Sequence, residues 1–135
     1  METKFNFKSQ VCTDKVQSER LLALGLKKET ADMRWERISE KYAYYPSTKT
    51  PYVSSDIPAW SLGRLVEMMP NNIHKYNDIA DLSVSNELVQ YRFYDVDYNH
   101  DVCLEHFNDG TLYDNIIDCI EWLIKEGYFN KEYLV

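Results

Sequence analysis

Carboxylates and histidines are concentrated between residues 95 and 106, where they could serve as ligands or as acid–base groups. The run DVDYNHD (95–101) places oxygen-bearing side chains at alternate positions, and a hard cation such as Ca²⁺ prefers oxygen ligands. The helix–loop–helix calcium loop also requires glycine at its sixth position and glutamate at its twelfth, where this chain has His100 and His106. The residues on both sides alternate in the manner of strands. We therefore interpret the run as the polar turn of a β-hairpin.

A second pattern in the same region, His100-x-x-Cys103-x-x-His106, has the residue types of a soft-metal site. Side chains three residues apart on a strand point to opposite faces, so Cys103 can join both histidines only if a bulge interrupts the strand. No second pair of cysteines supplies a fourth ligand at the usual spacing. We therefore assign no metal ligand and no cofactor to this chain.

The three cysteines, Cys12, Cys103 and Cys119, are widely spaced and odd in number, and the start of the chain has no export signal. We therefore expect free thiols in a reducing cytoplasm. Cys119 falls on an apolar helical stripe, and the nearby acids Asp118 and Glu121 would raise the pKa of its thiol. We expect Cys119 to fill the core, as free cysteines usually do, and not to act as a nucleophile.

Other catalytic patterns are incomplete in this sequence. Only four glycines are present, and none belongs to a phosphate-binding loop. No nucleophile-elbow pattern occurs, although a Ser/His/Asp arrangement assembled in space would leave no local pattern of this kind. We therefore assign no catalytic residue from the sequence.

The net charge of −7 is unevenly distributed along the chain. Residues 1–75 hold 12 Lys/Arg against 9 Asp/Glu, whereas residues 76–135 hold 3 against 13. The acidic second half argues against direct binding of nucleic acid, because it would repel a phosphate backbone. It could instead attract a basic partner, hold a cation or face the basic half of its own fold, and the last is the most common reason for such asymmetry.

Tyrosine is abundant, with 11 residues, and no apolar run is long enough to cross a membrane. Tyrosine combines a large apolar ring with a polar tip, so it suits half-buried sheet faces and interfaces equally well. We expect most tyrosines to pack in strands. We also expect a cytoplasmic protein that does not associate with membranes.

The clearest element is a helix over residues 111–127, TLYDNIIDCIEWLIKEG. Its apolar residues recur at intervals of three and four, which places them on one stripe of a helix. Thr111 can cap the free amides of the first turn, and Gly127 can adopt the left-handed conformation that ends a helix. We expect the stripe to pack on the strands that precede it, with Ile116, Ile120 and Leu123 buried.

The first half of the chain alternates between helical and extended patterns. We predict a helix over residues 14–25 with Thr13 as its N-cap, and a half-buried strand over 31–38. Tyr42 and Tyr44 lie on one side of a second candidate strand, which Pro46 interrupts. The run PSTKTPYVSSDI (46–57) is rich in Ser, Thr and Pro, which predicts a surface loop of the kind that often binds partners.

The second half begins with a predicted helix from Ile57 to about Met69, which Pro58 opens and Pro70 limits. Residues 71–86 have no clear period, so we assign no element there. The remaining elements before the last helix are a strand from Glu87 to about Phe93, a turn over 97–101 and a partner strand over 102–107. We expect the tail, residues 128–135, to pack back on the domain.

These elements predict one α+β domain spanning residues 1–135, with about three helices packed on a mainly antiparallel sheet. Three segments carry a family resemblance: QSERLLALGL (17–26), TADM (30–33) and IPAWSLGRLVEMMP (57–70). In these the chain resembles a family of small uncharacterised proteins from Bacteroides-type gut bacteria and from their prophages or mobile elements. The family has no assigned activity, so the resemblance implies only an intracellular accessory protein, with a phage or mobile-element origin as one alternative.

Two hypotheses of function follow from the sequence. The first is a non-enzymatic accessory factor that binds another protein, through a surface formed by Tyr52, Asp95, Asp97, His100, Asp101, Asp118 and Glu121. The second is an enzyme whose Asp/His pocket is assembled in space from the 95–106 hairpin, with His106 included, beside the loop at residues 46–57. Assembly into homo-oligomers, as in a structural component of a particle, is a third alternative.

Overall fold

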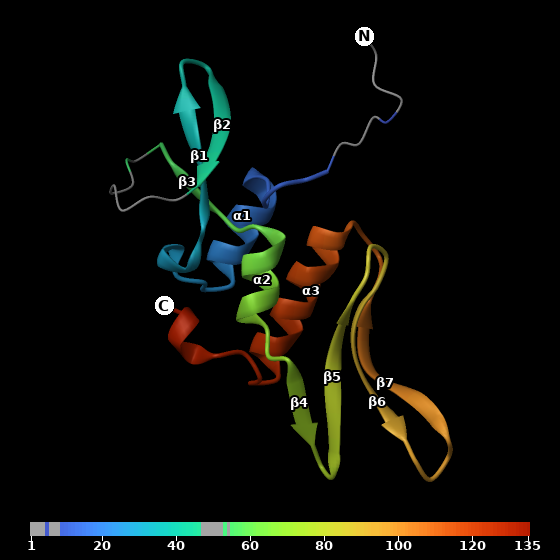
Figure 1. Ribbon diagram of the computed structural model, residues 1–135. Coiled ribbons are helices and arrows are strands. Elements are labelled where there is room, and N and C mark those ends of the chain that lie inside the picture. Colours follow the sequence, from blue (N-terminus) through green and yellow to red (C-terminus); the bar gives the residue numbers. More distant parts are fainter. Residues whose placement is uncertain (1–4, 6–8, 47–52, 54) are drawn as a thin grey trace.

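The computed structural model describes residues 5, 9–46, 53 and 55–135, which form three α-helices and two antiparallel sheets (Figure 1). The predicted α+β fold is therefore confirmed, with two separate sheets where the sequence analysis expected one. The loop predicted over residues 46–57 falls largely outside the described residues, and Tyr52 is among those not described.

The first sheet has three strands in the order β2-β1-β3: β1 (Met33–Ile38), β2 (Lys41–Pro46) and β3 (Ile57–Ala59). The second sheet has four strands in sequential order: β4 (Asn72–Lys75), β5 (Asp78–Val84), β6 (Val89–Asp95) and β7 (His100–Phe107). Both sheets are antiparallel throughout.

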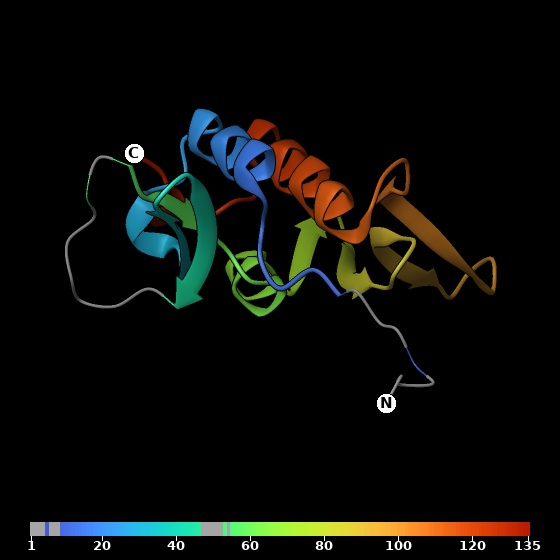
Figure 2. The ribbon, with the colours of Figure 1, turned by 90° about the horizontal axis from the view of Figure 1, so that it is seen from above.

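The described residues also form three α-helices: α1 (Lys15–Ala23), α2 (Leu62–Met68) and α3 (Leu112–Lys125). Helices α1 and α3 lie side by side along one side of the molecule, and α2 lies on the other (Figure 2). Two short 3₁₀ turns, η1 (Lys28–Thr30) and η2 (Lys131–Tyr133), complete the fold.

The prediction for the last helix is confirmed. Ile116, Ile120 and Leu123 are fully buried, and α3 packs on β6 and β7. The Thr111 hydroxyl accepts a hydrogen bond from the Asp114 amide at 3.3 Å, and Gly127 adopts φ +77° beyond the helix end. Burial of each large aliphatic side chain stabilises the fold by about 1.5–3 kcal/mol.

The N-cap of α1 is Asp14, so the prediction of Thr13 was wrong. The Asp14 carboxylate accepts from the Gln17 amide at 2.7 Å, and the Gln17 side chain accepts from the Asp14 amide at 3.0 Å. Thr13 is instead a buried polar centre of the fold. Its hydroxyl accepts a hydrogen bond from the Trp60 amide at 3.0 Å, and its carbonyl accepts from the Trp35 indole at 2.8 Å.

The predicted start of the second helix at Ile57 was also wrong. Residues 57–59 form β3, in which Pro58 lies opposite Arg34 at the edge of the three-stranded sheet. Proline is tolerated in an edge strand because its missing amide removes no required ladder bond. Helix α2 begins only after Ser61, whose hydroxyl accepts from the Arg64 amide at 3.2 Å.

Residues 72–84, which the sequence left unassigned, form the hairpin of β4 and β5. Its periodicity is weak because β4 has only four residues and buries only Ile73, while β5 buries only Ala80. The hairpin of β6 and β7 is confirmed, although β7 begins two residues earlier than predicted, at His100. In the tail, Phe129 is buried and Leu134 packs on the core, as expected.

Candidate interaction surface

The four-stranded sheet extends beyond the end of α3, so its β4–β5 and β6–β7 turns project from the rest of the molecule (Figure 1). We call residues 75–81 and 92–104 the distal sheet surface. They comprise the turn between β4 and β5, the turn between β6 and β7, and the adjoining ends of these strands.

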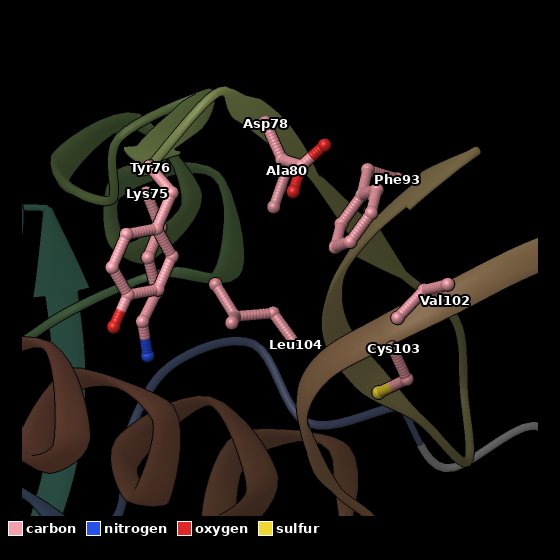
Figure 3. A pocket seen from close by; sticks show the side chains of 8 residues that line it. All are labelled: Lys75, Tyr76, Asp78, Ala80, Phe93, Val102, Cys103 and Leu104. Carbon is pink, nitrogen blue, oxygen red and sulfur yellow. The ribbon is translucent and has the colours of Figure 1, made fainter. Parts of the chain in front are cut away.

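A half-open cavity of about 260 Å³ lies on this surface, and none of its lining residues belongs to α3. Its apolar lining comes from three neighbouring strands: Ala80 of β5, Phe93 of β6, and Val102 and Leu104 of β7. Lys75, Tyr76, Asp78 and Cys103 complete the lining, and the side chains surround an open centre (Figure 3). The cavity therefore combines an apolar interior with polar groups contributed mainly by the β4–β5 hairpin.

A β-bulge in β7 helps to form this cavity. Tyr91 pairs with Glu105 and Arg92 pairs with Cys103, so Leu104 has no opposing residue on β6. A bulge of this type re-aims side chains at a sheet edge, and here Leu104 both lines the cavity and packs against the core.

The turn between β4 and β5 exposes the aromatic ring of Tyr76, whose backbone has a positive φ. Lys75 pairs with Asp78, which leaves Tyr76 and Asn77 as a two-residue turn. Tyr76 has φ +57° and 92% of its surface is exposed. A left-handed backbone at a bulky residue is costly, and such strained residues cluster at functional sites. Ser39, the first residue of the two-residue β1–β2 turn, has a similar φ of +61°, so the geometry of tight hairpin turns accounts for this backbone. The exposed Tyr76 ring lies beside the Lys75 ammonium, 5.9 Å from the ring centroid.

The turn between β6 and β7 is organised by Asp95. Its carboxylate accepts hydrogen bonds from the amides of Asp97 at 3.0 Å and Tyr98 at 3.3 Å. Asn99 takes a left-handed conformation with φ +54°, which asparagine tolerates well. This geometry agrees with the polar hairpin turn inferred from the sequence. It leaves exposed apolar and aromatic side chains along the turn: Tyr94, Val96 and Tyr98.

The distal sheet surface is acidic. It contains five aspartates, Asp78, Asp81, Asp95, Asp97 and Asp101, against the two cations Lys75 and Arg92. Arg92 lies 3.6 Å from Asp101, so one of the two cations is already close to a carboxylate. In contrast, the side chains of Asp78 and Asp97 have no hydrogen-bond or ion-pair partner within the described part of the chain.

Four of the predicted surface residues, Asp95, Asp97, His100 and Asp101, meet at this end of the sheet. The other two that the structure describes lie on α3 and are engaged within the fold: Asp118 and Glu121 each accept a hydrogen bond from the Arg20 guanidinium of α1 at 2.7 Å. Part of the acidic second half therefore faces the basic first half of the same chain.

The histidines do not assemble with carboxylates in the way the enzyme hypothesis requires. Among the described residues, no histidine ring forms a hydrogen bond or ion pair with a carboxylate, and the His100 ring contacts the Tyr98 carbonyl at 3.2 Å. The strands that flank residues 47–56, β2 and β3, lie at the opposite end of the molecule from the β6–β7 turn (Figures 1 and 2). The described residues that flank this loop therefore lie far from the β6–β7 hairpin.

The strands also place the residues of the His100-x-x-Cys103-x-x-His106 pattern on both faces of the sheet. The bulge at Leu104 places Cys103 and His106 opposite Arg92 and Gln90, which share one face of the sheet. His100 pairs with Asp95 and therefore lies on the other face. In the part of the chain that the structure describes, no three His, Cys, Asp or Glu side chains are grouped to hold a metal ion.

The cysteines differ in accessibility. Burial raises the pKa of the Cys119 thiol to about 12 and that of Cys12 to about 11, and nearby carboxylates add to both shifts. Cys119 is fully buried among core side chains, as predicted. Cys103 is exposed at the edge of the cavity, so it is the accessible thiol of the three.

The sequence analysis missed the contribution of the β4–β5 hairpin to this surface. Lys75, Tyr76, Asp78 and Ala80 all belong to the segment without a clear period. The available signal was a two-residue gap containing asparagine between the short alternating runs that begin at Asn72 and end at Val84, a pattern typical of tight hairpins.

No protein-family model matches the chain, and no curated protein and no solved structure is similar to it. None of the helices in the described residues is long and apolar enough to span a bilayer. The geometry of the distal sheet surface is therefore the basis for assigning a function.

Proposed function

We propose that this chain is a non-enzymatic accessory factor of the cytoplasm that binds another protein through its distal sheet surface. The observation that carries the proposal is an apolar cavity beside exposed tyrosines at the one end of the four-stranded sheet that α3 leaves uncovered. Contiguous exposed apolar surface with a polar rim is typical of protein-binding sites, and tyrosine is favoured in them.

The chemistry of the surface favours binding over catalysis. The cavity lining contains no histidine, and its cysteine has a raised pKa because it is partly desolvated. Nucleophilic cysteines need a lowered pKa and a nearby base. An intracellular accessory role is also the setting implied by the resemblance to the Bacteroides-type family and its mobile elements.

Co-purification with matched variants tests the proposal. The distal variant combines Tyr76→Gly with Tyr98→Ser, and the control variant combines Ser39→Gly with Val16→Ser; all four side chains are exposed, and Ser39 and Val16 lie far from the distal sheet surface. We expect tagged wild-type protein and the control variant to retain the same partner, identified by mass spectrometry, when purified from the cells that produce the chain. The distal variant should lose it.

Two results would contradict the proposal. In the first, the distal variant retains every partner of the wild type. In the second, the wild-type protein recovers no partner and remains monomeric in light scattering at high concentration.

A further inference from the structure

We infer that the partner presents a basic segment with one apolar anchor side chain, and that the anchor enters the cavity lined by Ala80, Phe93, Val102 and Leu104. This inference rests on the proposed function and specifies the chemistry of the partner. It follows from the shape of the cavity, the charge around it and the exposed ring of Tyr76 at its edge.

The cavity fits a side chain better than a larger ligand. Its volume of about 260 Å³ lies near the lower end of the range of roughly 300–1,000 Å³ that is usual for small-molecule pockets. Its floor is formed by carbon-rich side chains from three adjacent strands, with Ala80 only 2% exposed. An aliphatic or aromatic anchor would exclude water from this floor, which is the usual arrangement at the centre of a protein interface.

The charge around the cavity selects the residues that flank the anchor. Asp78 and Lys75 both line the cavity, and Asp97 lies outside its lining, in the turn that joins β6 to β7. The distal sheet surface as a whole has five aspartates against two cations, so its net charge is negative. Within the described residues neither carboxylate has a partner, whereas Asp118 and Glu121 are paired with Arg20. Unpaired carboxylates on the surface around an apolar site attract lysine or arginine and repel acidic segments, which gives specificity and faster association.

Tyr76 completes the site as an aromatic wall. Its exposed ring lies at the cavity edge, and Figure 3 shows it on the side opposite Phe93 and Val102. An exposed aromatic face can stack on an arginine guanidinium or lie beneath a lysine ammonium. The Lys75 ammonium of the same chain already lies 5.9 Å from the centroid of this ring, so a cationic side chain of the partner would share the ring with Lys75.

Selection from a displayed library of random strand-length peptides on the immobilised wild-type protein tests this inference. We expect the enriched peptides to carry Lys or Arg on both sides of one large apolar residue. The double variant Asp78→Asn/Asp97→Asn removes two charges without a change of shape. It should bind the enriched peptides about tenfold more weakly, and the difference should shrink at high salt.

The matched control is Glu19→Gln/Glu40→Gln, which removes the same charge from exposed positions on α1 and in the β1–β2 turn. It should bind the peptides like the wild type. A third variant, Val102→Asp, introduces a charge into the cavity lining and should abolish binding, with an unchanged circular dichroism spectrum as the check of folding.

Enrichment of acidic or uncharged peptides would overturn the inference, and so would equal affinity for Asp78→Asn/Asp97→Asn and the wild type. No enrichment at all, or concentration-dependent self-association through the same surface, would overturn it as well. If a cellular partner is still lost from the Tyr76→Gly/Tyr98→Ser variant in any of these cases, the proposed function stands and only the chemistry assigned to the partner fails.

Discussion

Replacement of Tyr76 by glycine should stabilise the fold and weaken binding at the same time. A left-handed backbone costs an L-residue about 1–2 kcal/mol, and glycine avoids this cost. The greater backbone freedom of glycine stabilises the unfolded chain by about 0.5–1 kcal/mol, which offsets part of this gain in stability. Because the tyrosine ring is 92% exposed, its removal forfeits little packing. The expected net gain in the free energy of unfolding is about 0.5–1 kcal/mol, or roughly 2–4 °C in Tm.

The assay has two readouts, urea denaturation for stability and titration calorimetry for affinity. Ser39→Gly is the matched control, since Ser39 has φ +61° in the β1–β2 turn of the other sheet. Its hydrogen bond from Arg37 uses the Ser39 carbonyl, which glycine retains. Ser39→Gly should stabilise the fold by a similar amount and leave binding unchanged. Tyr76→Gly should weaken the partner or the selected peptide by about fivefold or more, which corresponds to about 1 kcal/mol.

Either of two results would refute this reasoning. A loss of stability of about 1 kcal/mol or more in Tyr76→Gly would mean that the ring supports the fold, so its strain would have a structural purpose. A gain in stability without any loss of affinity would mean that the strained ring takes no part in binding.

Three further predictions concern the rest of the molecule. Thr13→Val should destabilise the fold by about 1–3 kcal/mol in urea denaturation, because the buried Trp60 amide loses its hydrogen-bond acceptor. Thr13→Ser should keep most of the stability, and equal losses in the two variants would argue against a role for the hydroxyl. The side-chain amide of Gln17, followed by the Thr111 hydroxyl and backbone amide, holds the pKa of Asp114 below its ordinary value of 3.8. This carboxylate therefore stabilises the fold above pH 3.8, and the stabilisation is lost as the pH falls through the lowered pKa. Acid unfolding of Asp114→Asn should therefore be less steep below about pH 4 than that of the wild type, and identical curves would contradict the linkage. N-ethylmaleimide should modify Cys103 in the native protein and leave the two buried cysteines intact in peptide mass spectrometry; a native adduct on either buried thiol would contradict their assignment to the core.

The elements that could be predicted from the sequence are those whose determining residues lie within the element itself. The helix at residues 111–127 has an uninterrupted apolar stripe, an N-cap and a terminal glycine, so both its existence and its buried face could be inferred. The strands of residues 33–46 and the last hairpin also have clear alternation. In each case a short window of sequence contains the cause of the structure.

The errors arose where the deciding contact is distant in the chain. Thr13 and Asp14 are equally good N-caps, and the choice depends on Trp35 and Trp60, which use Thr13 from far along the sequence. The acids of α3 resembled free surface charges because their partner, Arg20, lies about 100 residues away. Such pairings become visible only when α1 is placed beside α3.

Four residues of the surface predicted from the sequence lie close together in the structure, because they share the last hairpin. The apolar cavity was not foreseen, because it requires the bulge at Leu104 and the hairpin around Tyr76 to meet across the sheet. Neither feature has a strong local signal, since a bulge depends on the pairing of two strands.

The most direct measurement is the dissociation constant of the co-purified partner for three proteins: the wild type, the distal variant Tyr76→Gly/Tyr98→Ser and the control variant Ser39→Gly/Val16→Ser. If the distal sheet surface is the binding site, the distal variant binds about tenfold or more weakly while the control variant matches the wild type. Equal dissociation constants for all three proteins would place the binding site elsewhere and contradict the account.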